Sequence, residues 1–302
     1  MFNLHRCFLA KESAYCALSF LAAFNALLPS ILFNWRSHTA AAAISSGLGQ
    51  NLTIWLAILS SVYLLLKYPF TVINHRNAGI TQHLLVLSLA LLLLIPNATL
   101  SWLISALASF FWWIKAPLNS ASRNAALLMI AVAMRDPLSL LGLNLFTEQL
   151  LGFDRYITQT MLNVSFSGTN LSNIVIGEQF NLVILTGCSS FTNISLAVLF
   201  WLNLSILLHK TTHKTDCLRL LLLITLCVLC NSFRLSLMSK SLPDYQFYHL
   251  GFGAQLFSYL STFMVLICLN WRISHAKYLS NSAANDINLN HSRGISPYLP
   301  RL

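Results

Sequence analysis

Long apolar runs separated by short polar segments dominate the hydrophobic pattern of the chain. Each run is about 16–23 residues long, close to the roughly 20 residues that an α-helix needs to cross a bilayer. Only Pro96-Asn97 separates the third run from the fourth, and proline cannot continue a helix, so a tight hairpin is expected there. The pattern predicts an all-α integral membrane protein, a polytopic bundle of about eight transmembrane helices at residues 15–34, 50–66, 80–95, 98–114, 124–146, 190–208, 218–233 and 251–270.

The composition excludes a soluble fold. Hydrophobic residues make up 56% of the chain, charged residues only 9%, and the mean hydropathy is +0.67, whereas a soluble domain carries about 25% charged residues. The net charge of +10 could suggest a nucleic-acid partner. The basic residues lie in short loops between apolar runs, however, where they act as topology signals rather than as a basic face. We therefore expect a lipid bilayer and no nucleic acid as the environment of this chain.

The loop charges predict the orientation. The first run is longer than the apolar core of a cleaved signal peptide, so we expect a retained helix. With the N-terminus and C-terminus on the cytoplasmic side, most lysines and arginines lie on that side, as the positive-inside rule requires. Five of the eight acidic residues lie on or toward the outer side, Asp154 among them. Thirteen of the 18 lysines and arginines lie on the predicted cytoplasmic side: Arg6, Lys11, Lys67, Arg76, Lys115, Arg123, Lys210, Lys214, Arg219, Arg272, Lys277, Arg293 and Arg301.

The fifth apolar run and the segment after it are less regular. Arg135-Asp136-Pro137 interrupts the run, and the two charges either pair inside the bundle or mark a break after which the helix follows the interface. Residues 148–163 mix apolar and charged positions, which predicts an amphipathic helix near the outer surface. Residues 164–185 alternate and are β-branched, which predicts a small extended or hairpin element on the outer face before the sixth helix.

The domain organisation follows from this pattern. Residues 1–279 form one transmembrane domain, with the chemistry-bearing residues at about 150–270, and residues 280–302 form a polar, flexible cytoplasmic tail. Most of the seven cysteines lie in apolar runs or on the inner side, which argues against a disulfide framework. Cys227 and Cys230 form a C-x-x-C within an apolar helix, which is typical of packing. No zinc, P-loop or nucleophile-elbow motif occurs, so neither a metal nor a cofactor is expected.

Three residues of catalytic types fall at the same membrane face. Cys188 precedes the sixth helix, Arg234 ends the seventh and His249 precedes the eighth. The orientation assigned from loop charges places all three on the outer side, although it was not built on them. Alone, each has an ordinary interpretation, because cysteine packs, arginine reaches the interface and histidine is often interfacial.

Together, the three residues suit acyl transfer. A thiolate is a nucleophile whose pKa falls near cations and helix N-termini, so we expect Cys188 to be activated. His249 can take the thiol proton and return one to a leaving amine, and Arg234 can stabilise an oxyanion. Asn231, one helical turn before Arg234, could orient the guanidinium. Three glycines beside the cysteine and the histidine could permit close substrate approach: Gly187, Gly251 and Gly253.

At these residues the chain resembles the exosortase/archaeosortase family of prokaryotic membrane transpeptidases. The resemblance rests on the apolar run Val183-Ile-Leu-Thr-Gly-Cys188-Ser, then Asn231-x-x-Arg234, then His249 with Gly251 and Gly253. It covers residues 150–270 well and the earlier helices only by hydropathy. The family commonly has a glycine two residues after the cysteine, where this chain has Ser190, which affects subfamily and substrate signal more than the nucleophile.

The resemblance implies a cysteine transpeptidase or protease at the outer face of a prokaryotic inner membrane. Cys188 would attack, Arg234 would stabilise the intermediate and His249 would act as acid and base. The implied partners are exported proteins with a C-terminal sorting signal of the PEP-CTERM type, consisting of a short motif, an apolar helix and a basic tail. The sequence leaves open the substrate protein, the acceptor nucleophile and the oligomeric state.

Two other functions compete with this one. A transporter or channel would need ionisable residues deep in its spans, and apart from Arg135-Asp136 and His83 the predicted spans are nearly all apolar. A catalytically inactive family member could serve as an assembly partner, in which case Cys188 would not react with thiol probes.

Overall fold

The computed structural model describes residues 11–37, 39–40, 43, 47–68, 80–162, 174–176, 181–208, 214–249 and 251–269. In this part of the chain, six helices are long and apolar enough to cross a membrane. The flexible tail predicted at 280–302 and the first part of the extended segment, 164–173, lie outside the described residues. The six helices are α2 (Lys11–Ser37), α6 (Ala98–Lys115), α7 (Ala121–Leu162), α8 (Ser190–Leu207), α9 (Lys214–Met238) and the helix Phe252–Leu269.

Each predicted apolar run forms a helix, which confirms the all-helical, membrane-embedded class. The count of eight spans is not confirmed, because α4 (Leu52–Lys67) and α5 (Ile80–Leu92) are short. At about 1.5 Å per residue, these two helices reach only about 24 Å and 20 Å, less than the roughly 30 Å of a hydrocarbon core. The turn expected at Pro96-Asn97 separates α5 from α6, and the Asn97 side chain caps α6 by accepting a hydrogen bond from Leu100 N.

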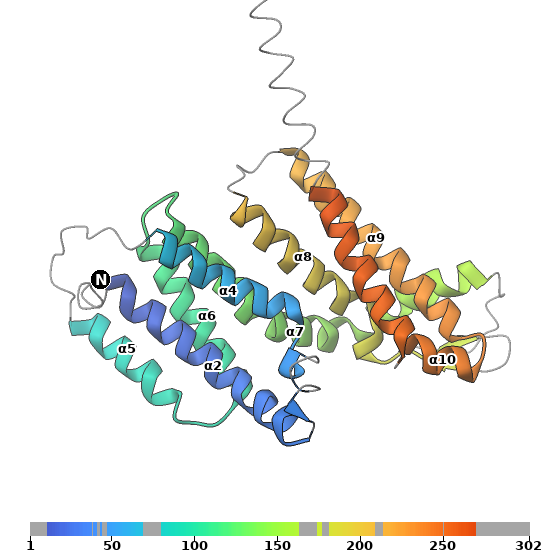
Figure 1. Cartoon of the computed structure of the whole chain (residues 1–302), viewed down its shortest axis with the longest axis horizontal. Coiled ribbons are helices and arrows are strands. Elements are labelled where there is room, and N and C mark those ends of the chain that lie inside the picture. The colour runs from blue at the N-terminus through green and yellow to red at the C-terminus, as the bar shows by residue number, and fades with distance from the viewer. Residues whose placement is uncertain are drawn as a thin grey trace, which may run out of the picture.

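The helices form two groups joined by α7 (Figure 1). In the first group, α2 packs on α6, and both α6 and α4 pack on the beginning of α7. In the second group, α8 packs on α9, and the short helix α10 (Leu242–His249) packs on the end of α9. Since α7 contacts helices of both groups, it fixes the second group relative to the first.

Apolar side chains cover the outside of the helices. Leu59, Leu66 and Phe33 are 60%, 61% and 68% exposed, which suits contact with lipid tails rather than water. Between helices, small polar side chains meet instead: Ser105 Oγ donates to Ser19 O at 3.0 Å, linking α6 to α2. Such contacts allow the close backbone approach that stabilises helix pairs in membranes.

Helix α7 is 42 residues long, about 63 Å at about 1.5 Å per residue, so it extends well beyond one bilayer crossing. It runs through Pro137 and departs from helical dihedrals at Phe146 (φ −127°, ψ 28°). Arg135 pairs with Asp136 at 2.6 Å and also donates from Nε to Ser195 Oγ of α8 at 3.3 Å. Of the two possibilities left open by the sequence, the structure therefore has the paired charges, and the joint in the helix lies nine residues after Pro137.

The segment after Phe146 is helical and amphipathic, as predicted: Phe153 and Tyr156 are 53% and 56% exposed, whereas the opposite face is buried. Leu151 is 4% exposed and Asp154 only 1%. The buried face packs on the turn that precedes α8. That Asp154 lies toward the outer side of the membrane stays a prediction.

The predicted hairpin is present. Strands β1 (Ile174–Ile176) and β2 (Asn181–Val183) are antiparallel, with Val175 opposite Leu182. Both of these side chains are buried, at 0% and 4% exposure, in a cluster with Leu235 of α9. The hairpin therefore anchors the 3-10 turn η2 (Thr186–Cys188), which leads directly into α8.

Candidate functional site

Cys188 is the last residue of the turn η2. Its N–H donates to Leu185 O at 2.9 Å, which closes the turn. Ser189 is the N-cap of α8, and its side chain accepts a hydrogen bond from Phe191 N at 3.2 Å. Cys188 thus lies just outside the helix rather than on its first turn, and its side chain is 9% exposed.

Asp154 of α7 holds the residues that follow Cys188. Its Oδ2 accepts hydrogen bonds from Ser189 Oγ at 3.0 Å and from Ser190 N at 2.9 Å. A carboxylate here satisfies a free N–H at the start of α8 and is favoured by the helix dipole. Sequence reasoning missed this role. The spacing of Leu151, Asp154 and Thr158 places them on one helical face, which could have indicated that Asp154 packs inward. In the structure all three are buried.

Asn231 of α9 holds the same turn from the opposite side. Its Nδ2 donates to Cys188 O at 2.9 Å and to Ser190 Oγ at 3.1 Å, and its Oδ1 accepts from Asn193 Nδ2 at 3.0 Å. The expectation that Asn231 orients the guanidinium was wrong, because its amide turns toward α8 and binds there. Asn231 instead fixes the backbone of the nucleophile candidate.

His249, the last residue of α10, lies next to Cys188. Its Nδ1 is 3.8 Å from Cys188 Sγ. The ring of Tyr245, one turn earlier on α10, stacks on the imidazole with ring centroids 4.9 Å apart and planes 28° apart. Positions four residues apart share a helical face, so α10 both carries the imidazole and restrains its orientation.

Arg234 is oriented by the neighbour of His249. Its Nε donates to Tyr248 O at 2.9 Å, a carbonyl in the last turn of α10, where oxygens lack partners within the helix and a cation is favoured. The charge of Arg234 acts on both groups: it opposes the rise that burial causes in the pKa of Cys188, and it adds to the fall that burial causes in the pKa of His249. The end of α10 therefore positions the guanidinium and the imidazole together.

The three glycines differ in what they do. A Cβ on Gly187 would meet nothing within 4 Å, so packing does not require glycine at this position. A Cβ on Gly251 would lie 2.9 Å from Phe247 O, and one on Gly253 would lie 2.6 Å from Tyr248 Cδ1. The latter two glycines allow the close return of the chain after α10, and close approach of substrate at these positions stays a prediction.

The electrostatic balance keeps Cys188 and His249 uncharged. Burial raises the pKa of the Cys188 thiol above its ordinary value, and the nearby Arg234 only partly opposes this. Burial, followed by the charge of Arg234, lowers the pKa of His249. The expected activation of the thiol by a lowered pKa was therefore wrong in direction, because burial at the turn outweighs the cation. At neutral pH both shifts favour the uncharged forms, a thiol beside a neutral imidazole.

The remaining chemistry of the described residues is limited. No group of three or more His, Cys, Asp or Glu side chains in the described part of the chain is placed to hold a metal ion. Cys227 and Cys230 are free thiols, 2% and 8% exposed, and Cys227 belongs to the apolar cluster between α8, α9 and the helix Phe252–Leu269. Comparison with known protein families, curated proteins and solved structures gave no match.

Proposed function

We propose that this protein is a membrane-embedded cysteine transpeptidase or protease of the exosortase type. One observation carries the proposal: Cys188 Sγ lies 3.8 Å from His249 Nδ1, within reach of the charge of Arg234. A nucleophile beside a base, with a fixed cation for the developing negative charge, is the arrangement that acyl transfer requires.

In the first step, the Cys188 thiol gives its proton to His249 Nδ1 as Sγ attacks the carbonyl carbon of the scissile peptide. With the resting proton on Nε2, Nδ1 is free to accept it. Negative charge develops on the carbonyl oxygen, which the Arg234 guanidinium stabilises. His249 then gives the proton from Nδ1 to the leaving nitrogen, the C–N bond breaks and a thioester on Cys188 remains.

In the second step, an acceptor with a proton to lose attacks the thioester carbonyl. His249 takes that proton and returns it to Sγ as the C–S bond breaks, which restores the neutral pair. Water as acceptor makes the reaction a hydrolysis, and an amine or a lipid group makes it a transfer.

The substrates in this proposal are exported proteins with a C-terminal signal of a short motif, an apolar helix and a basic tail. The site would act at the outer face of a prokaryotic inner membrane, with both termini of the enzyme cytoplasmic. The bias of lysine and arginine toward the predicted inner loops supports this orientation. The membrane-embedded helices support a substrate that is itself held in the bilayer.

The test is processing of a signal-bearing exported protein in cells that express the wild type, Cys188→Ala or Cys188→Ser. We expect both variants to abolish processing at normal abundance, and Cys217→Ala, which removes an exposed free thiol of α9, to leave it intact. Unchanged processing by the Cys188 variants would refute the proposal. Solute flux in liposomes that is insensitive to Cys188 would indicate a transporter, and a Cys188 that no thiol probe modifies would indicate an inactive assembly partner.

A further inference from the structure

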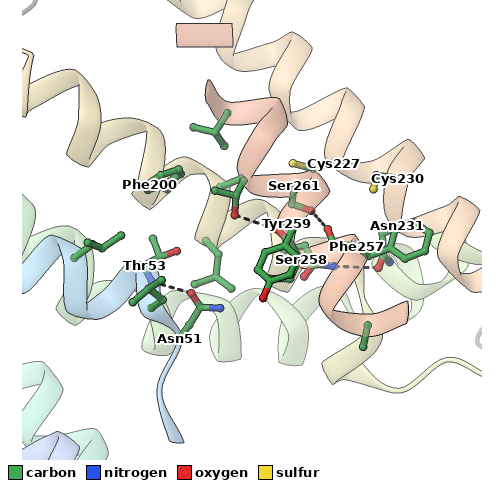
Figure 2. A pocket seen from close by; sticks show the side chains of 18 of the residues that line it. Asn51, Thr53, Phe200, Cys227, Cys230, Asn231, Phe257, Ser258, Tyr259 and Ser261 are labelled. Atoms are coloured by element: carbon green, nitrogen blue, oxygen red, sulfur yellow. Dashed lines mark hydrogen bonds between the residues drawn. The ribbon is translucent and has the colours of Figure 1, made fainter. Parts of the chain in front are cut away.

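A cavity of about 530 Å³ lies beside the candidate site, within the second group of helices and the start of α4. Its walls come from the helices α4, α8, α9 and Phe252–Leu269, together with Gly47 of the 3-10 turn η1 (Gly47–Gly49) and the residues that lead into α4. Figure 2 shows Asn51 and Thr53 on one side of it, facing Ser258 and Tyr259. Arg234 and Asn231 line the same cavity, although both also act on Cys188. The cavity and the thiol therefore share the guanidinium.

The lining has an unusual chemistry for a pocket between membrane helices. Among the described residues that line it, Arg234 is the only charged one. Neutral amide and hydroxyl side chains, which both donate and accept hydrogen bonds, alternate with apolar side chains around the cavity. The neutral polar side chains include Asn51, Thr53, Asn193, Ser258, Tyr259 and Thr262, and the apolar ones include Leu52, Leu56, Leu196, Phe200 and Val265.

This lining discriminates between classes of ligand. None of the described lining residues is a carboxylate, so a cationic ligand would find no counter-charge. A phosphate group would have one cation, and the Nε of that cation already donates to Tyr248 O. Peptide groups, in contrast, are neutral donors and acceptors, which is what the polar side chains of this cavity complement.

A peptide inside a membrane enzyme needs such partners. For its carbonyl to be attacked, a helical substrate must unwind locally, and the freed N–H and C=O groups cannot find water in the bilayer. Each unsatisfied group costs several kcal/mol in hydrocarbon. A cavity with neutral polar groups for the backbone and apolar walls for the side chains lowers this cost. Its volume lies within the roughly 300–1,000 Å³ typical of binding pockets.

Resting on the function proposed above, we propose that the cavity binds the first, unwound residues of the substrate's apolar segment. Arg234 lines the cavity and its charge acts on Cys188, so a scissile carbonyl at the guanidinium would place the adjoining residues in the cavity. The cavity would thus recognise an uncharged, apolar stretch of polypeptide directly next to the cleaved bond.

The test uses the full chain with Cys188→Ala in phosphatidylcholine liposomes. The probe is a synthetic peptide with a short polar motif, a 20-residue apolar segment and a basic tail, carrying benzoyl-phenylalanine at successive positions of the apolar segment. Cross-linked residues are identified by mass spectrometry. Ser258→Trp and Leu56→Trp fill the cavity from opposite walls, and Ser88→Trp places the same indole at an exposed position of α5.

We expect probes in the first turn of the apolar segment to cross-link to cavity residues. Either filling variant should reduce these cross-links about tenfold, equivalent to about 1.4 kcal/mol of binding free energy, and Ser88→Trp should not. First-turn cross-links that map elsewhere, that go to lipid, or that persist in both filled variants overturn the proposal. Cleavage of the same peptide by protein with Cys188 intact is scored separately: its absence would refute the transpeptidase function, whereas cleavage without cavity cross-links would refute the cavity alone.

Discussion

Asp154 offers the sharpest test of how the site is held, because its carboxylate contacts neither the thiol nor the imidazole in the described hydrogen bonds. Asp154→Asn keeps the shape of the side chain and removes its charge. Oδ2 accepts two hydrogen bonds, from Ser189 Oγ and Ser190 N. A hydrogen bond to a charged group contributes about 1.5–3 kcal/mol and a neutral one about 0.5–1.5. The substitution should therefore weaken the clamp by about 1 kcal/mol per bond, about 2 kcal/mol in all.

If that loss is expressed as misplacement of Cys188, kcat should fall about thirtyfold, since about 1.4 kcal/mol corresponds to a factor of ten. KM should change little, because Asp154 lies behind the turn that carries the thiol. Asp154→Ala leaves two donors unpaired, at about 1–3 kcal/mol each, so it should lower both kcat and the thermal midpoint. The measurements are the cleavage kinetics of a signal peptide, the alkylation rate of Cys188 by iodoacetamide and the midpoint of thermal unfolding.

Asp136→Asn is the matched control on the same helix, because the Asp136 side chain is 41% exposed and, among the described residues, pairs with its neighbour Arg135. It should leave kcat and the thermal midpoint within about twofold and 1–2 °C of wild type, as partly exposed ion pairs contribute little. The positioning role is refuted if Asp154→Asn keeps wild-type kcat, or if KM rises in place of the fall in kcat.

Four further outcomes are expected. His249 must be uncharged to accept the thiol proton, and burial holds its pKa below the ordinary 6.5, so kcat/KM should decrease only when the pH is lowered below about 6.5; a midpoint above that value would contradict the burial argument. In His249→Ala, the rate of alkylation of Cys188 should increase with rising pH, with a midpoint above 9.0, because burial raises the pKa of the thiol. Arg234→Gln should lower kcat about 10²–10³-fold and move the acid limb to higher pH, since Arg234 lowers the pKa of His249; an unmoved limb would show that the guanidinium acts elsewhere. Gly253→Ala should lower kcat and the thermal midpoint, because its Cβ would lie 2.6 Å from Tyr248 Cδ1, whereas Gly187→Ala enters open space and should leave the midpoint unchanged.

The sequence predicted the helices well, because residues that face lipid must be apolar over a fixed length. Each apolar run became a helix, and the alternating segment before Cys188 became the β1–β2 hairpin. It did not predict which helices are long enough to cross a bilayer, because hydropathy continues into turns: the run at 80–95 includes the three residues after α5, which ends at Leu92. Nor could it locate the joint in α7 at Phe146, where proline at 137 gave the stronger local signal.

The site was predictable by residue type but not by contact. The loop charges predicted that Cys188, Arg234 and His249 share one membrane face. In the structure, Cys188 Sγ lies 3.8 Å from His249 Nδ1. The partners of these residues depend on side-chain direction, which the sequence does not contain. Asn231 therefore turned out to bind the Cys188 carbonyl, and a buried carboxylate, Asp154, came from a helix that composition alone suggested was a surface element.

The separation of Cys188 from His249 along the chain has a consequence for biosynthesis. The two residues are 61 positions apart, which at about 5–20 residues per second is roughly 3–12 s of translation. During that interval the nascent chain contains the thiol and its Asp154 clamp but lacks the imidazole. The Arg234 guanidinium is also oriented late, since the Tyr248 carbonyl to which it donates is synthesised just before His249. If the proposed function holds, a chain built in this order would stay inert toward neighbouring polypeptides until α10 is made.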